Sequence, residues 1–464
     1  MAVLMKSFLR SLFSAEGVTD RRTYALVGVI GFALKHNLDR FLATVVFHRP
    51  WSPFNYWVPI GDVARITQVP ENEAVFLAAM LALALPFIWV GVVLTQKRLR
   101  SAALPPWLVG LFFIPFLNLV FFIVLSLIPE REAGAHPHSG TSTSSLARVM
   151  PQSQLGSAVV ALLVTVPFGF GVTLLGADVL KNYGWGTFVA IPFTIGFIAA
   201  TLYGITRPRT FAGCVGVACL SVTLLGVALL ALAVEGIFCL VMALPLALPL
   251  AAFGGACAFG VQRMRWSQAT GPAFLSALLL VAPGIEIVEH VAARPAPLFV
   301  VHSSIDIQAP PEKVWQQVIA FTQIPDPTEW MFRSGIAYPI RAEMIGRGVG
   351  AERHCVFSTG AFVEPIQIWD PPRQLKFSVA SNPAPMQEWT PYKHIQPPHL
   401  HGFLVSEGGQ FLLTPLPNGG TRLEGTTWYH HGLWPSRYWK LWSDAIIHRI
   451  HMRVLTHIRD EAES

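Results

Sequence analysis

Residues 155–293 form an apolar stretch that could not fold as a soluble domain, and this stretch constrains the whole chain. Between Leu155 and Val261 almost every window of about 20 residues is apolar, the length a helix needs to cross a hydrocarbon core of roughly 30 Å. After Pro295 the pattern changes to short strands, Pro/Gly turns and a long C-terminal helix rich in Trp and His. The sequence therefore predicts a multi-pass all-α membrane domain followed by an α+β domain at the bilayer surface.

The charge content agrees with a membrane location. Only 13% of the 464 residues are charged and 53% are hydrophobic, whereas soluble domains carry about 25% charged residues. The net charge of +6, spread over so few charges, suits loop arginines beside anionic lipid better than a nucleic-acid surface. We therefore expect the lipid bilayer as a partner and no nucleic acid.

Eight apolar segments are candidate membrane crossings, which would place both chain ends on one side. Basic residues near the first two segments, such as Arg21 and Arg98, favour the cytoplasm of a bacterial inner membrane for that side, and hence for the C-terminal domain. Arg207 and Arg263 would then lie outside, so the alternative is that one apolar segment does not cross. The segments are Tyr24–Phe47, Ala74–Leu94, Leu104–Ile128, Leu155–Ala177, Gly184–Ile205, Phe211–Ala233, Ile237–Val261 and Gly271–Val291.

The composition divides the chain into four parts. Residues 1–129 form an N-terminal membrane unit of about three spans, and residues 130–154 are a polar Ser/Thr/Gly/Pro linker expected to be disordered. Residues 155–293 form a second membrane unit of about five spans. Residues 298–464 form the α+β domain.

The first unit carries a set of basic residues around its apolar segments. Arg21-Arg22 precede the first segment, Arg98-Leu99-Arg100 follow the second, and Trp107 begins the run that ends at Pro129. With these features, residues 1–130 resemble the bacterial inner-membrane family called domain of unknown function 805. That family usually follows its arginines with His-Asp and a Gly, where this chain has Ser101-Ala102-Ala103. The resemblance implies topology and location only.

The C-terminal domain shows the order strand, helix, antiparallel strands and long helix. A strand over Phe299–Ile307 leads into Ala309-Pro310-Pro311-Glu312-Lys313-Val314-Trp315, where the prolines and the acidic residue indicate a helix start. Pro417-Asn418-Gly419-Gly420 indicates a hairpin between two later strands, and a helix runs from Tyr438 to about Glu461. The other expected strands are Ile340–Gly346, Ala351–Ser358, Phe362–Trp369, Gln374–Ala380, His401–Pro415 and Thr421–Tyr429.

With its proline-rich helix entry, Gly-Gly hairpin and terminal helix, the domain resembles the SRPBCC superfamily, which includes START, polyketide-cyclase and birch-pollen-allergen-like domains. The resemblance implies a helix-grip fold, in which a curved antiparallel sheet wraps the long C-terminal helix around a deep apolar cavity. It implies no particular reaction and no universal metal or cofactor, and we expect no cofactor.

Glu364 is the first candidate for a functional group in such a cavity. On an extended strand it shares a face with Phe362 and Ile366, which are apolar. A carboxylate there has a raised pKa, or else it pairs with an arginine such as Arg353 on a neighbouring strand.

Histidines and aromatic residues supply the other candidates. Asp444, His448 and His451 share one stripe of the last helix, a spacing that suits metal ligands or an acid–base pair but also ordinary surface pairing. The five cysteines show no zinc-site spacing, and we predict no metal. The aromatic residues suit either core packing and membrane anchoring or a cavity lining; they are Trp389, Tyr392, Trp428, Tyr429 and Trp442. The Pro-rich stretch 383–398 is a candidate lid.

The leading hypothesis is a polytopic membrane protein whose C-terminal domain binds a lipid or another hydrophobic small molecule. The first alternative is a membrane-tethered cyclase, dehydratase or hydrolase that uses the same cavity. Glu364 or His448 would then act as the base and Tyr392 or Tyr429 as the proton donor, with Asp444 as a further catalytic candidate. The second alternative is a structural or regulatory protein with a filled cavity.

Overall fold

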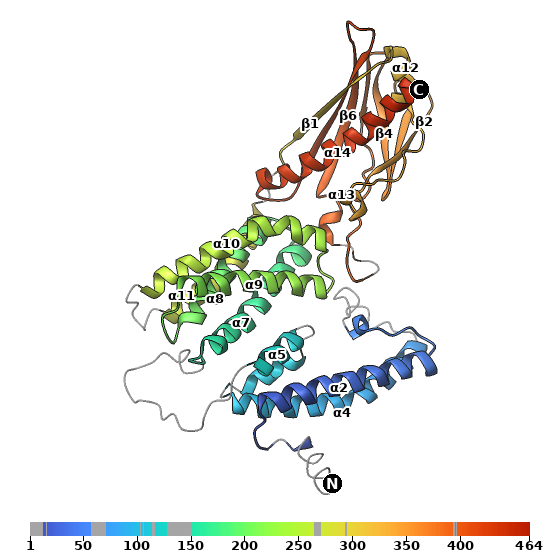
Figure 1. Cartoon of the computed structure of the whole chain (residues 1–464). Helices are drawn as coiled ribbons and strands as arrows, with labels where there is room; N and C mark the ends of the chain where they lie inside the picture. Colours follow the sequence, from blue (N-terminus) through green and yellow to red (C-terminus); the bar gives the residue numbers. More distant parts are fainter. Residues whose placement is uncertain are drawn as a thin grey trace. The chain divides into compact units, whose positions relative to one another are not determined.

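The computed structural model describes residues 13–14, 16–56, 71–102, 104, 106–113, 117–127, 150–263, 271–292, 295–392, 395 and 397–464 (Figure 1). The linker predicted at 130–154 lies almost entirely outside the described residues. The chain divides into two compact units. One contains residues 1–172, 191–234 and 245–282, and the other contains residues 173–190, 235–244 and 283–464.

The first unit is helical. Its α-helices begin with α2 (Arg21–Phe41), where the Asp20 side chain accepts a hydrogen bond from the Thr23 backbone N–H and so caps the helix. The others are α4 (Glu71–Ser101), α5 (Leu117–Leu127), α7 (Gln154–Leu174), α8 (Ile191–Gly204) and α9 (Phe211–Ala231). Two more helices, α10 (Ile237–Arg263) and α11 (Gly271–Val291), contribute residues to both units. Shorter helical turns of this unit are η1 (Leu42–Val46), η2 (Pro53–Tyr56) and η4 (Pro106–Phe113), while η5 (Leu175–Val179) and η6 (Gly186–Ala190) belong to the second unit.

Five helices among the described residues are long and apolar enough to cross a membrane: Val75–Ser101, Gln154–Val179, Gly186–Gly204, Phe211–Ala231 and Ile237–Arg263. Each corresponds to one of the eight predicted segments. Within the predicted segment Leu104–Ile128, the described residues form the 3-10 helix η4 and the 11-residue helix α5. In α2, Lys35 and Asp39 form an ion pair one turn apart, which lowers the cost of charges on an otherwise apolar helix.

Glycines allow α8 and α10 to pack at close range in the first unit. A Cβ placed on Gly196 would lie 2.6 Å from the Ala251 carbonyl oxygen, and one placed on Gly254 would lie 2.4 Å from the Phe193 carbonyl oxygen. Small residues at a helix contact let two backbones approach this closely, as in membrane helix pairs. By contrast, nothing lies within 4 Å of the Cβ position of Gly260, farther along α10.

The second unit contains a seven-stranded antiparallel sheet and the long helix α14 (Ser436–Glu463). The strand order is β1-β7-β6-β5-β4-β3-β2, so the first strand joins the last and the sheet curls into a half-barrel beside α14 (Figure 1). The strands are β1 (Phe299–Ile307), β2 (Pro339–Ile345), β3 (Glu352–Phe357), β4 (Gly360–Asp370), β5 (Gln374–Ser378), β6 (Leu404–Pro415) and β7 (Thr421–His431). The remaining elements are α12 (Pro311–Ile319), α13 (Trp330–Arg333) and η7 (Pro398–Leu400).

This architecture confirms the predicted sheet wrapped on a terminal helix. Pro311 occupies the first turn of α12, where its missing N–H costs nothing. The hairpin between β6 and β7 closes through Gly419, which has a φ of +81° and so adopts a conformation that glycine tolerates best. The apolar face of α14 packs on the sheet through Val454, Leu455 and Ile458, and this contact forms the main core of the unit.

A β-bulge in β4 changes which residues face that core. Ile366 pairs with Phe377 and Ile368 pairs with Lys376, so Gln367 is left without a directly opposite residue. The bulge reverses the alternation of side chains beyond it. As a result Ile368 is exposed, while Trp369 packs inward with its ring centroid 5.7 Å from that of Trp315.

A cavity between the sheet and the terminal helix

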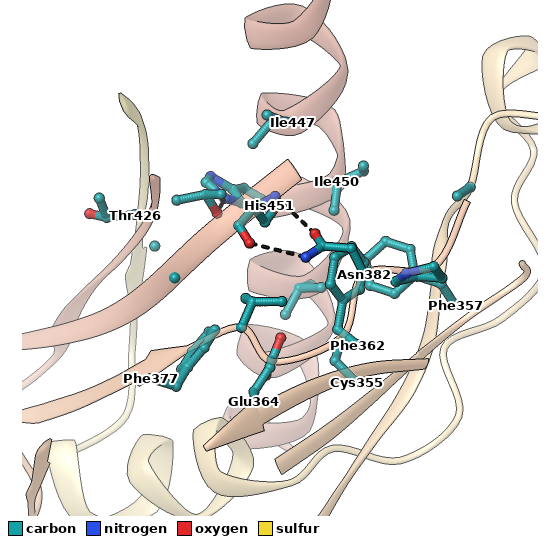
Figure 2. A pocket seen from close by; sticks show the side chains of 18 of the residues that line it. Cys355, Phe357, Phe362, Glu364, Phe377, Asn382, Thr426, Ile447, Ile450 and His451 are labelled. Atoms are coloured by element: carbon teal, nitrogen blue, oxygen red, sulfur yellow. Dashed lines mark hydrogen bonds between the residues drawn. The ribbon is translucent and has the colours of Figure 1, made fainter. Parts of the chain in front are cut away.

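A cavity of about 140 Å³ lies within the second unit, between the sheet and α14, and it is partly open to the surface (Figure 2). Its lining is mostly apolar. Alternate residues of β3, such as Cys355 and Phe357, contribute to the wall, because alternate side chains of a strand point to the same face. Ile447, His451 and Val454 contribute from α14, at the spacing of one helical face.

Arg353 and Glu364 form a buried ion pair in the cavity wall. The two residues lie directly opposite each other on β3 and β4, and the Arg353 Nη1 donates to the Glu364 Oε2. Their side chains are only 2% and 8% exposed. Burial raises the pKa of the Glu364 carboxyl and the Arg353 guanidinium opposes that shift. For Arg353, burial lowers the pKa but the Glu364 carboxylate raises it further, so the guanidinium stays charged.

Aromatic rings surround the Arg353 guanidinium. Its central carbon lies 5.5, 5.6 and 5.4 Å from the ring centroids of Phe321, Phe377 and Phe411 respectively. Such contacts are favourable for a cation that has lost its water. The structure therefore shows the alternative in which Glu364 pairs with Arg353. The two charges offset each other in this part of the cavity wall.

His451 is the second polar group of the cavity. Its Nε2 lies 2.7 Å from the Thr427 Oγ1 and its Nδ1 lies 3.1 Å from the Ser303 Oγ. Burial lowers the pKa of His451 to about 4, and the nearby His448 and His302 lower it in the same direction. The ring is therefore neutral at pH 7, and both of its nitrogens lie within hydrogen-bond distance of protein hydroxyl groups.

The connection between β5 and β6 supplies another part of the wall. Asn382 accepts a hydrogen bond of 2.8 Å from the Ser406 N–H and donates one of 3.3 Å to the Ser406 carbonyl (Figure 2). Pro383, Ala384 and Pro385 follow it along the lining. The first residues of the predicted Pro-rich lid thus contact the cavity, while residues 393, 394 and 396 lie outside the described part of the chain.

Three of the residues proposed from the sequence as site residues line the cavity, namely Glu364, Phe362 and His451. The structure places Ile366 in the packed core beside the cavity. His448 is exposed on α14 and its Nδ1 lies 2.7 Å from the Ser303 Oγ. The remaining proposed residues lie outside the lining: Trp389, Tyr392, Trp428, Tyr429, Trp442 and Asp444.

Three of these residues are held away from the cavity by their own surroundings. Trp389 is 65% exposed in the β5–β6 connection. The Trp428 ring lies beneath the Lys376 ammonium, 5.1 Å from it. Tyr429 is fully buried and donates a 2.7 Å hydrogen bond to Asp444, which also pairs with Lys440.

Two further proposed residues take other positions. Trp442 packs against a second core cluster that contains Trp439 and Phe332. Tyr392 is half-buried, and its backbone N–H donates to the Thr390 Oγ1 at 2.9 Å. Sequence reasoning missed Phe377, Ile447 and Asn382; the first two could have been found from the strand alternation and from the helical stripe that contains His451.

One group of side chains in the described part of the second unit could hold a metal ion. It consists of Glu235, Cys239, Glu388 and His399, and their donor atoms lie within 4.8 Å of one another. The stripe of Asp444, His448 and His451 does not converge in this way, because Asp444 pairs with Lys440 while both histidines face Ser303.

No protein-family model matches this chain, and no curated protein does. Solved structures similar to a part of it include a protein from Nitrosospira multiformis (18% identity, 36% of this chain and 97% of that chain, TM-score 0.24). Another is the Zhui aromatase/cyclase from Streptomyces sp. R1128 (15% identity, 36% of this chain and 94% of that chain, TM-score 0.23). A third is a norcoclaurine synthase point mutant from Thalictrum flavum (12% identity, 36% of this chain and 96% of that chain, TM-score 0.23). Similarity at these TM-scores establishes neither a family nor a function. The resemblance of residues 1–130 to domain of unknown function 805 stays a prediction.

Proposed function

We propose that the C-terminal sheet-and-helix domain, as an SRPBCC-like module, binds a hydrophobic small molecule or the apolar part of a lipid in its cavity. The observation that supports this function is a mostly apolar cavity left between the curled sheet and α14. Small-molecule sites are typically concave, apolar and provided with a few polar groups. At about 140 Å³, the cavity is similar to one of about 150 Å³ that accepts benzene. It therefore suits a ring or a short branched group, with the rest of a larger ligand leaving through the open side.

The polar groups of the wall favour a neutral ligand. Arg353 and Glu364 neutralise each other, and His451 is uncharged at pH 7 because its pKa is about 4. A charged ligand would lose its hydration without gaining an unpaired counter-charge from these three groups. A neutral, mostly apolar molecule would be accommodated better.

The helical part of the chain gives this binding a plausible setting. Its five long apolar helices would anchor the domain at a membrane, which we propose is the bacterial inner membrane, with the domain on the cytoplasmic side. An apolar ligand concentrates in the bilayer, so tethering its receptor there raises the effective ligand concentration.

Binding is favoured over catalysis by the positions of the acid–base groups. Glu364 is held by Arg353, His448 lies outside the lining, and the Tyr429 hydroxyl donates a hydrogen bond to Asp444. A general base must lie within hydrogen-bond reach of the proton that it removes. The enzyme alternative requires these three side chains to meet around one point of the cavity, and they do not.

Gly425 offers a direct test. It lines the cavity from β7, and a Cβ placed on it would meet nothing closer than Leu455 at 3.7 Å. A Gly425→Leu substitution should therefore fill the cavity without a clash at the first atom. The matched control is Glu424→Leu on the adjacent residue of the same strand, whose side chain is 36% exposed.

The experiment measures the affinity of an environment-sensitive apolar fluorophore for the full-length protein in lipid nanodiscs. Empty nanodiscs provide the background of lipid partitioning. We expect Gly425→Leu to weaken binding at least about tenfold, which corresponds to about 1.4 kcal/mol, and Glu424→Leu to bind like the original protein. Equal binding by both variants, with unchanged near-ultraviolet circular dichroism, would refute a ligand site in this cavity.

A further inference from the structure

Four potential metal-binding side chains meet near the start of α10. Glu235 lies just before α10 and Cys239 lies in its first turn, while Glu388 and His399 come from the connection between β5 and β6. The Cys239 Sγ lies 2.7 Å from the Glu388 Oε1 and 3.0 Å from the His399 Nε2. The His399 Nε2 lies 3.4 Å from the same Glu388 oxygen. One sulfur, one nitrogen and one oxygen therefore face a common point.

These groups are buried and incompletely paired. The side chains of Glu388, Glu235 and His399 are 0%, 8% and 10% exposed. Three polar atoms of the cluster have no hydrogen-bond partner, namely the Oε2 of Glu388, the Oε2 of Glu235 and the Nδ1 of His399, although the last two lie 3.4 Å apart as an ion pair. An unpartnered buried polar atom is costly, and two carboxylates with one histidine lack a second cation. A bound cation would supply the missing positive charge.

The surroundings fit a prepared site. Gly236 lies between Glu235 and Cys239 along the chain, and a Cβ placed on it would come within 1.7 Å of the Glu388 Oε2. Only glycine therefore lets Glu388 reach Cys239. The Ile237 N–H donates to the Trp389 carbonyl at 3.1 Å, which joins the two segments beside the cluster.

We propose that Cys239, Glu388 and His399 bind a divalent transition-metal ion, with Zn²⁺ as the preferred ion, and that Glu235 orients His399. Thiolate, imidazole and carboxylate are the ligands that Zn²⁺ takes. Tetrahedral Zn²⁺ places such donor atoms about 3.4–3.6 Å apart, so the observed separations would have to expand by less than about 1 Å. The Cys239 thiol loses its proton on binding, and a water or ligand oxygen takes the fourth position.

Glu235 stands on the other side of the imidazole. Its Oε2 lies 3.4 Å from the His399 Nδ1, and its Oε1 accepts a 2.9 Å hydrogen bond from the Tyr183 hydroxyl. A carboxylate that receives the second N–H of a metal-bound histidine, and is itself held by a hydrogen bond, fixes the ring and strengthens the ligand. Glu235 is therefore a positioning residue. The proposal does not depend on the ligand proposed for the cavity.

The test uses the full-length protein, stripped with a chelator and then loaded with Co²⁺ or Zn²⁺. We expect one ion per chain and a near-ultraviolet sulfur-to-cobalt charge-transfer band. Cys239→Ser should abolish the band, while Cys257→Ser, on the same helix, should keep it. His399→Gln should lose the metal and His401→Gln should retain it, and Glu235→Gln should weaken binding about 10- to 100-fold.

Metal-binding measurements on the wild-type protein can overturn the proposal even if a variant fails to fold. Failure to retain Zn²⁺ at micromolar free metal would exclude the site. A bound Co²⁺ without a thiolate band would exclude Cys239 as a ligand. Equal metal retention by Cys239→Ser and Cys257→Ser would also exclude Cys239 as a ligand. If Glu235→Gln bound the metal as tightly as the wild-type protein, Glu235 would have no positioning role.

Discussion

The buried pair of Arg353 and Glu364 makes a quantitative prediction about the stability of the sheet. Replacing Glu364 with Gln removes the counter-charge and leaves the Arg353 guanidinium, which is 2% exposed, among three phenylalanine rings. Breaking one partner of a buried pair costs about 3–5 kcal/mol. Replacing both partners with apolar residues, as in Arg353→Met with Glu364→Leu, should cost far less, because no uncompensated charge remains.

Hydrogen exchange followed by mass spectrometry on the full chain measures this effect locally. For Glu364→Gln, amides in β3 and β4 that exchange through unfolding of the domain should exchange about 100- to 4,000-fold faster, since each 1.4 kcal/mol is a factor of ten. The double variant should be close to the original protein. A loss of less than about 1 kcal/mol in Glu364→Gln, or a double variant as unstable as the single one, would refute the reasoning.

The chain contains a matched control for this experiment. Asp306 and Arg422 also form a cross-strand pair, with hydrogen bonds of 2.7 and 2.9 Å, but both side chains are about half exposed. Water screens an exposed pair and solvates whichever partner remains. Asp306→Asn should therefore leave the exchange of β1 and β7 unchanged.

Three further predictions concern other parts of the structure. The folded-state pKa of His451 is depressed to about 4, so the unfolded chain binds the proton first as the pH falls. The free energy of unfolding should therefore fall by at most about 3 kcal/mol between pH 6.5 and pH 4. In denaturant titrations His451→Gln should lose this pH dependence. Gly236→Ala should displace Glu388, and metal analysis should show a weaker affinity for Zn²⁺; unchanged affinity would contradict the close approach. Gly254→Leu should lower the melting temperature in detergent, whereas Gly260→Leu, which meets open space, should not; equal melting would argue against close packing of α8 and α10.

The sequence was a good guide to the fold of the C-terminal domain, because alternation and turn residues are local signals. The expected strand 299–307 coincides with β1, and the expected helix 438–461 lies within α14. The period-2 face of β4 was followed correctly from Phe362 to Glu364 and Ile366, but the bulge at Gln367 ended the alternation. Nothing in a single strand reveals a bulge, because it depends on the register with the neighbouring strand.

The cluster proposed to bind a metal ion could not be predicted for a different reason. Cys239 lies about 150 residues before Glu388 along the chain, and Glu388 and His399 lie in a long connection without regular spacing. A metal motif is recognisable in a sequence when its ligands are close together on one helix or loop. Here only the tertiary structure brings the ligands together, and Cys239 looked like one more apolar thiol of a membrane helix.

The connection between β5 and β6 contributes Asn382 and Pro385 to the cavity wall, and a few residues later it contributes Glu388 and His399 to the cluster. A molecule that changes the conformation of this stretch on entering the hollow must alter the affinity for the ion, and the ion must then alter the affinity for that molecule by the same factor. Such reciprocity would make occupancy at one place depend on supply at the other, so that the protein responds to two chemical signals with one stretch of backbone.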